Sequence, residues 1–226
     1  MVDRRRALCA EALGTALLVA GVVGSGIMAQ RLTHDGAVAL LCNAIATGAL
    51  LTVLIAMFAP LSGAQFNPAV TLAFVVRGEM SVGDGLRYAA AQVLGAIAGT
   101  FLAHAMFALP VFAFGVGVRS GAHLWLCEAV ATFGLLSVIF ALRDRGANLV
   151  APGVGLYIAA AYWFTASTSF ANPAATVGRA LTPTFAGIRP LDSPMFVVAQ
   201  VAGALLAAGV ASWLFRPPAL PTAAQA

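Results

Sequence analysis

Long runs of apolar residues follow one another along the chain, and the short segments between them hold most of the charged positions. Six of these runs cover residues 8–29, 38–59, 86–107, 122–142, 149–166 and 195–215. A helix needs about 20 predominantly apolar residues to cross the hydrocarbon core of a bilayer. The pattern therefore predicts an all-α membrane protein with six transmembrane helices.

Two further apolar segments, residues 67–76 and 172–181, are too short to cross a bilayer. Each begins with the tripeptide Asn-Pro-Ala, formed by Asn67, Pro68 and Ala69 in the first and by Asn172, Pro173 and Ala174 in the second. Asparagine is favoured as a helix N-cap and proline at the first helical position. Ten helical residues rise about 15 Å, which is half of the hydrocarbon core. We therefore predict two re-entrant half-helices that start at the membrane centre.

The segments that lead into these half-helices, "PLSGAQF" and "TASTSFA", lack the pattern of a regular helix. Their backbone carbonyls would lie at membrane depth, where lipid offers no hydrogen bonds. Such backbone is tolerated only when it is buried in protein or lines a water-filled cavity. The two loops therefore predict a pore between them.

The two halves of the chain resemble each other in three places, in the same order. "CAEALGTALL" resembles "CEAVATFGLL", "FNPAVT" resembles "ANPAAT", and "AQVLGAIAG" resembles "AQVAGALLA". Each half holds three predicted spanning helices, so the second half must enter the membrane from the opposite side. We predict one transmembrane domain over residues 1–226, with inverted repeats at approximately 7–110 and 120–216. Such repeats commonly place their function near the midplane of the bilayer.

The composition agrees with a membrane protein and sets its orientation. The chain is 61% hydrophobic and 9% charged, whereas soluble domains carry about a quarter charged residues. The net charge of +4 comes from arginines that are scattered along the chain. They do not form the basic patch that nucleic-acid binding requires. Cytoplasmic segments are enriched in basic residues. This rule assigns eight arginines to the cytoplasm, namely Arg4, Arg5, Arg6, Arg77, Arg87, Arg143, Arg145 and Arg216, and four to the outside, namely Arg31, Arg119, Arg179 and Arg189.

Both termini are therefore predicted to be cytoplasmic, with the protein in the inner membrane. The opening "MVDRRRALCAEALG" could also begin a signal peptide. The length of the apolar run that follows, and its Glu11, favour a first spanning helix.

Two carboxylates, Glu11 and Glu128, occupy matching places in the two halves. They could titrate in a proton-coupled transporter, or they could accept hydrogen bonds from the backbone of the re-entrant loops. Their symmetric placement favours the second role. The cysteines Cys9, Cys42 and Cys127 have no metal-ligand spacing and are predicted to pack in the core, and His104 is predicted to be a packing or interface residue. Neither a catalytic constellation nor a cofactor is predicted.

The paired motifs resemble those of the aquaporin or major intrinsic protein family, and the resemblance covers essentially the whole chain. It implies six tilted helices around a pore, two half-helices that meet at the Asn-Pro-Ala motifs, and a homotetramer with one pore per subunit. It also implies passive transport of water and small neutral solutes. Two facing helix N-termini repel cations, and the side-chain amides of Asn67 and Asn172 are expected to donate hydrogen bonds into the lumen.

In this family a narrow ring outside the motifs sets selectivity, and it commonly includes an aromatic residue and an arginine directly after the second Asn-Pro-Ala. Carried over, the arginine position is Ala175, the aromatic position is Thr47, and a third is Ser169. The position on the fifth helix is Ala160 by an ungapped count or Tyr162 by alignment through Gly155, and the choice stays open. The missing guanidinium predicts a wider, less cationic filter that passes glycerol-like polyols.

The stretch "YWFTASTSFANPAAT" resembles bacterial aquaglyceroporin-like channels associated with arsenic resistance, which implies arsenous acid or methylated arsenicals as candidate solutes. Arg179, one turn beyond Ala175, is predicted either at the outer mouth or as a snorkelling surface residue. Two other functions stay open. One is a narrow water-selective aquaporin in which Tyr162 refills the ring, and the other is an ion-coupled secondary transporter.

Overall fold

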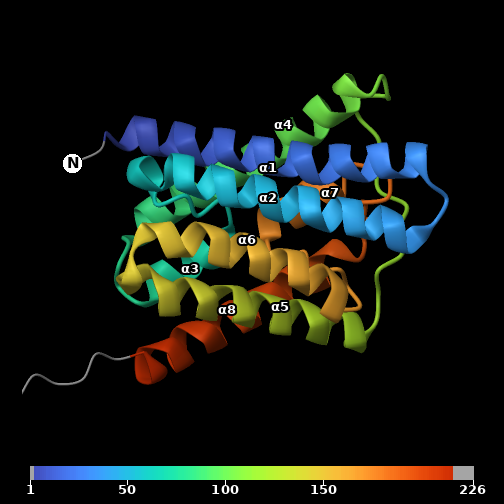
Figure 1. The fold of residues 1–226 in the computed structure, drawn as a ribbon. Helices are drawn as coiled ribbons and strands as arrows, with labels where there is room; N and C mark the ends of the chain where they lie inside the picture. The colour runs from blue at the N-terminus through green and yellow to red at the C-terminus, as the bar shows by residue number, and fades with distance from the viewer. Residues whose placement is uncertain (1–2, 216–226) are drawn as a thin grey trace, which may run out of the picture.

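A computed structural model describes residues 3–215, and regular structure within that range is helical. The helices are α1 (Arg4–Leu32), α2 (Gly36–Ser62), α3 (Pro68–Val76), α4 (Val82–Met106), α5 (Ala122–Leu142), η1 (Arg143–Arg145), α6 (Ala147–Phe164), α7 (Pro173–Arg179) and α8 (Ser193–Leu214). Helices α1, α2, α5 and α6 run in nearly the same direction, α4 and α8 are tilted relative to them, and the short α3 and α7 lie among the long helices (Figure 1). The predicted all-α fold is confirmed. Arg216, which was assigned to the cytoplasmic side, lies outside the described residues.

Five of these helices, α1, α2, α4, α5 and α8, are long and apolar enough to cross a bilayer. The remaining predicted span became α6, which has 18 residues. At 1.5 Å per residue it is about 27 Å long, close to the thickness of a hydrocarbon core of about 30 Å. Each predicted apolar run has therefore formed a helix.

The half-helices begin where the Asn-Pro pattern predicts. Asn67 caps α3, and its side-chain oxygen accepts a hydrogen bond from the backbone N–H of Ala69. Asn172 caps α7 in the same way and accepts from the N–H groups of Ala174 and Ala175. A proline fills the first turn of both helices, where its missing N–H costs nothing. With 9 and 7 residues, both are too short to span.

Glycines allow the closest helix crossings, and they do so in the same way in both halves. A Cβ added to Gly95 of α4 would lie 2.2 Å from the carbonyl oxygen of Ala12 of α1. A Cβ added to Gly203 of α8 would lie 2.2 Å from the carbonyl oxygen of Ala129 of α5. Small residues at such crossings let helix backbones approach within van der Waals contact in membranes. Both close crossings therefore depend on a residue without a side chain.

We expect Gly203→Ala to lower the free energy of unfolding by about 1–3 kcal/mol, because the added methyl group forces α8 away from α5. Thermal unfolding in detergent measures the change. The matched control is Gly209→Ala on the same helix, where an added Cβ meets nothing within 4 Å. That substitution should leave stability unchanged or raise it by up to about 1 kcal/mol, since alanine is the better helix former. Equal effects of both changes would contradict the close-crossing interpretation.

One end of the bundle carries the start of α1, the end of α8 (Figure 1) and a set of ion pairs. The guanidinium groups of Arg143 and Arg77 both bind Glu79, and the hydrogen bonds from Arg143, followed by those from Arg77, hold the pKa of this carboxyl below its usual range. At the same end, Asp84 pairs with Arg4 and Arg87. Four of the arginines that the sequence assigns to one side of the membrane, Arg4, Arg77, Arg87 and Arg143, therefore lie at the same end of the bundle.

The cysteines do not lie where the sequence predicted them. Cys9 and Cys42 are exposed, and Cys127 is partly exposed. They lie on outward-facing sides of their helices, beside exposed apolar residues such as Leu13 and Leu126. The prediction of a core position was wrong because a lipid-facing surface is as apolar as the interior, so hydropathy does not separate the two.

Candidate functional site

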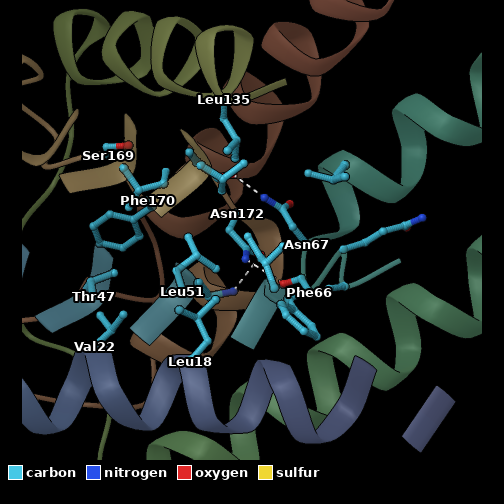
Figure 2. Close-up of a pocket in the computed structure, with 18 of the residues that line it drawn as sticks. Leu18, Val22, Thr47, Leu51, Phe66, Asn67, Leu135, Ser169, Phe170 and Asn172 are labelled. Atoms are coloured by element: carbon cyan, nitrogen blue, oxygen red, sulfur yellow. Dashed lines mark hydrogen bonds between the residues drawn. The ribbon is translucent and has the colours of Figure 1, made fainter. Parts of the chain in front are cut away.

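A cavity of about 70 Å³ lies between the helices and includes both Asn-Pro-Ala segments in its wall. Much of the wall is aliphatic, contributed by side chains such as Leu18, Val22, Leu51, Val70, Leu135 and Val154. The polar side chains in it include Thr47, Asn67, Tyr162, Ser169, Asn172 and Arg179. Figure 2 shows Asn67 and Asn172 facing each other from the two half-helices. One water needs roughly 10–15 Å³ of such space, so the cavity can hold several waters.

The two asparagine amides bind the opposite half of the chain. The Nδ2 of Asn67 donates to the carbonyl of Ala171 at 2.7 Å, and the Nδ2 of Asn172 donates to the carbonyl of Phe66 at 2.9 Å (Figure 2). Each amide nitrogen carries two hydrogens, so one hydrogen per asparagine is left for the lumen. The sequence predicted donation into the lumen but not the bond that joins the two halves.

The loops that precede the half-helices have the same unusual backbone in both halves. Ala64 and Phe66 have φ values of 49° and 50°, and Ser169 and Ala171 have 48° and 47°. These residues stand three and one positions before each asparagine. The left-handed conformation costs a non-glycine residue roughly 1–2 kcal/mol. Such strain persists only where surrounding contacts hold the chain in place.

Glu11 supplies those contacts in the first half. Its carboxylate accepts hydrogen bonds from the backbone N–H groups of Gln65 at 3.0 Å and Phe66 at 2.7 Å. It also accepts from the Ser62 hydroxyl at 2.6 Å and the Gln92 amide at 2.8 Å. Every oxygen of this buried carboxylate therefore has a donor, as a structural role requires.

Glu128 does the same in the second half. It accepts from the backbone N–H groups of Phe170 at 2.9 Å and Ala171 at 2.8 Å, and from the Gln200 amide at 2.7 Å. Both glutamates are fully buried, and the cavity wall is formed by other residues. The carboxylates hold the loops and do not face the lumen.

Three of the predicted filter positions, Thr47, Ser169 and Ala175, lie in the cavity wall. On the fifth spanning helix the wall contains Tyr162, whose hydroxyl lies 3.3 Å from the hydroxyl of Thr47. Ala160 is exposed on the outside of α6, so the ungapped count was wrong. Two residues correspond to about 200° around a helix, so the two candidates face opposite sides.

Arg179 is buried in the same wall, with 3% of its surface exposed. Its Nε donates to the carbonyl of Ala186, and its guanidinium carbon lies 3.2 Å from the ring centre of Phe170. A snorkelling position at the headgroups does not fit this burial. The side chain instead belongs to the cavity, one helical turn beyond Ala175.

A family model provides the deciding comparison. The model described as "Major intrinsic protein" matches residues 1–152 of the 226-residue chain. The chain belongs to the major intrinsic protein family. Together with the paired half-helices, this membership identifies a membrane channel for water and small solutes.

Relatives of this major intrinsic protein cover most of its length. Aquaglyceroporin AqpS of Rhizobium meliloti (strain 1021) is 55% identical over 215 residues, which is 95% of this chain and 92% of the relative. A probable TIP-type aquaporin of Medicago truncatula is 35% identical over 79% of this chain and 76% of its own. The X-ray structure of the aquaglyceroporin from Plasmodium falciparum superposes with a TM-score of 0.79 at 20% identity, covering 95% of this chain and 98% of the other. The structural match supports the fold.

Sequence reasoning missed the glutamines that complete each buried network in this major intrinsic protein. The Nε2 of Gln92 donates to Glu11 and to the hydroxyl of Thr71 of α3. Gln200 repeats this arrangement with its own half of the chain. The signal was available, because each glutamine is the centre of the repeated "AQV". A polar residue retained at matching places in two apolar helices predicts a shared buried partner.

His104 has partners that the sequence did not reveal. One ring nitrogen lies 3.0 Å from the carbonyl oxygen of Val111, and the other lies 2.8 Å from the hydroxyl of Thr182. The buried ring joins the end of α4 to the segments that follow α4 and α7. Its predicted packing role fits this placement, since the cavity wall is formed by other residues.

Proposed function

We propose that this channel passively conducts water and small uncharged hydroxylated solutes, with glycerol-like polyols and arsenous acid as candidates. Thr47, Tyr162, Ser169 and Ala175 would form its outer constriction. One observation carries the proposal. Ala175, at the position where the family commonly has an arginine, contributes only a methyl group to the cavity wall. No catalytic residue or cofactor takes part in this function.

The centre of the pathway favours neutral solutes. The N-termini of α3 and α7 face each other there, and each carries the equivalent of about half a positive charge. Cations therefore meet an electrostatic barrier. The remaining amide hydrogens of Asn67 and Asn172 can bind the oxygen of a water or polyol. Aliphatic side chains such as Leu51 and Leu135 can contact the carbon atoms of a polyol.

A narrow water-selective channel is the second candidate, and Tyr162 favours it. The tyrosine ring reaches the cavity wall, and its hydroxyl lies 3.3 Å from that of Thr47. A bulky side chain thus occupies part of the ring that two small residues, Thr47 and Ala175, would otherwise leave open. Glycerol flux separates the two candidates, because a ring closed by Tyr162 passes water alone.

An ion-coupled transporter has less support. The oxygens of both intramembrane carboxylates already accept hydrogen bonds from loop N–H groups and from the side chain of Gln92 or Gln200. Uptake of water, glycerol and arsenite into proteoliposomes, measured side by side with and without proton or sodium gradients, tests this point. We expect uptake of all three that is independent of the gradients. Saturable uptake that requires either gradient would contradict the channel.

The arrangement in the membrane is part of the same proposal. The two halves would form an inverted repeat within one domain, which their matching glutamate networks and glycine crossings support. The arginine-rich end of the bundle would face the cytoplasm of the inner membrane, with both termini on that side. Exposed apolar side chains on the helices, among them Leu86, Leu156 and Trp213, suit lipid contact and the subunit contacts of a homotetramer.

A further inference from the structure

The two re-entrant loops differ at one position of an otherwise similar backbone. Four residues before the asparagine, the first loop has Gly63 with a φ of 84°, and the second has Thr168 with a φ of 60°. Glycine adopts this left-handed conformation without steric cost. A β-branched residue such as threonine rarely adopts it, because its side chain crowds the backbone. The second loop therefore carries strain that the first avoids, and such strain persists only where neighbouring contacts hold the chain.

The hydrogen bond next to this position also differs between the halves. The carbonyl five residues before the asparagine belongs to Ser62 in the first loop, and it accepts from the Tyr88 hydroxyl at 3.1 Å. In the second loop it belongs to the buried Ser167, and it accepts from the Nη1 of Arg119, also at 3.1 Å. A charged donor makes the stronger hydrogen bond. A neutral hydroxyl thus holds the unstrained loop, and a guanidinium group holds the strained one.

Arg119 lies in the connection between α4 and α5, at the end of the bundle opposite the start of α1 (Figure 1). Its Nε donates to the carbonyl of Gly187 at 3.0 Å, and its Nη1 lies 3.5 Å from the hydroxyl of Thr168. Its guanidinium carbon lies 5.1 Å from the ring centre of Phe170, within the range of a cation–π contact. The backbone N–H of Arg119 donates to the carboxylate of Asp192 at 2.9 Å. The side chain therefore joins three segments and is itself fixed at its base.

We propose that Arg119 is a positioning residue for the constriction, which holds Thr168 in its left-handed conformation and thereby fixes Phe170 in the cavity wall. The cavity is lined by residues other than Arg119 and Thr168, so Arg119 acts on the solute pathway through this loop. The inference rests on the proposed function, because it names a residue that sets the shape of the same pathway.

Loss of this contact should narrow the cavity. Arg179 also lies against the ring of Phe170, with its guanidinium carbon 3.2 Å from the ring centre, and Arg179 is part of the cavity wall. Without Arg119, the remaining cation–π partner of Phe170 is the one at the cavity, so the ring is expected to move toward the lumen. One water needs only roughly 10–15 Å³. A polyol needs more of the cross-section and therefore loses more permeability than water does.

Arg119→Met tests the proposal, because methionine keeps an unbranched side chain and removes every hydrogen-bond donor. We expect it to lower glycerol permeability about fivefold and to keep water permeability within about twofold, as measured by stopped-flow light scattering on proteoliposomes. Adding Thr168→Gly should restore glycerol permeability to within about twofold of the wild type, because glycine removes the strain that Arg119 opposes. A general loss of stability would lower both permeabilities together, and a change at Thr168 would not correct it.

The matched control is Tyr88→Phe, which removes the corresponding hydrogen bond from the first loop. It should change neither permeability by more than about twofold, because Gly63 adopts its left-handed conformation without strain. An effect of Tyr88→Phe on the glycerol-to-water ratio as large as that of Arg119→Met would contradict the difference between the loops on which the proposal depends.

Hydrogen–deuterium exchange at the backbone amides of Ser169 and Phe170 reports on the loop without any solute. It should be about tenfold faster in Arg119→Met than in the wild type. If Arg119→Met fails to fold, Arg119→Lys takes its place, since an ammonium group lacks the planar fork that serves two carbonyls, and the same pattern is expected at a smaller size. Unchanged exchange in the folded variant overturns the proposal, as does a failure of Thr168→Gly to restore glycerol permeability. A wild-type channel that excludes glycerol contradicts the proposed function, and the exchange rates then decide whether Arg119 holds the loop.

Discussion

Ala175→Arg is expected to lower glycerol permeability about tenfold or more, a change of at least about 1.4 kcal/mol in the barrier, while water permeability stays within about threefold. The Ala175 side chain lies in the wall of a cavity of about 70 Å³. A guanidinium there fills the space that a polyol needs but leaves room for a file of water. Its charge also lies one turn from Arg179, which increases the positive potential. Stopped-flow light scattering on proteoliposomes measures both permeabilities.

The matched control for this change is Ala175→Ser, which adds a single oxygen and keeps the constriction open. The backbone is preserved in both variants, since the N–H of residue 175 still donates to the side chain of Asn172. We expect the serine variant to conduct glycerol nearly as well as the wild type. Undiminished glycerol permeability in a folded A175R channel would show that this residue is not in the constriction.

Glu128→Ala is expected to lower the free energy of unfolding by about 3 kcal/mol or more and to abolish water flux. The change leaves three buried donors without their acceptor, namely the backbone N–H groups of Phe170 and Ala171 and the amide of Gln200. Each such orphaned donor costs roughly 1–3 kcal/mol. The left-handed backbone at Ala171 also loses the contact that holds it. Thermal unfolding in detergent provides the measurement.

Ser137→Ala is the control on the same helix, because the hydroxyl of Ser137 binds only the carbonyl of Phe133 within α5. Its effect should stay below about 1 kcal/mol. Glu128→Gln addresses the transporter alternative. In a coupled transporter this variant would fold normally and lose its dependence on an ion gradient, whereas here it should be destabilised as well. A Glu128→Ala protein with the melting temperature of the wild type would remove the structural role that we assign to this carboxylate.

The parts of the fold that the sequence predicted correctly are those set by local rules. Apolar runs of spanning length formed the long helices. The Asn-Pro pairs marked the starts of α3 and α7, because asparagine caps a helix and proline fits its first turn. The repeated glutamates suggested a shared structural role, and Glu11 and Glu128 bind equivalent N–H groups in the two loops.

The parts that escaped prediction depend on which side of a helix faces the interior. Counting residues could not choose between Ala160 and Tyr162, because both positions are apolar or aromatic in an apolar helix. Hydropathy placed Cys9 in the core, although it lies on an outward face. Predicting the burial of Arg179 would have required the path of the loop that follows it, because the Nε of Arg179 donates to the carbonyl of Ala186 in that loop. These features come from tertiary packing, which leaves no periodic signal in the sequence.

Glycerol permeability of the purified wild-type channel tests the central claim most directly. Sealed proteoliposomes shrink when mixed with hypertonic glycerol, and they swell again only if glycerol enters. The account predicts rapid shrinkage followed by channel-dependent reswelling, because Ala175 leaves the outer constriction open. Rapid shrinkage without reswelling beyond that of protein-free vesicles would contradict it, and would show that Tyr162 closes the ring to all but water.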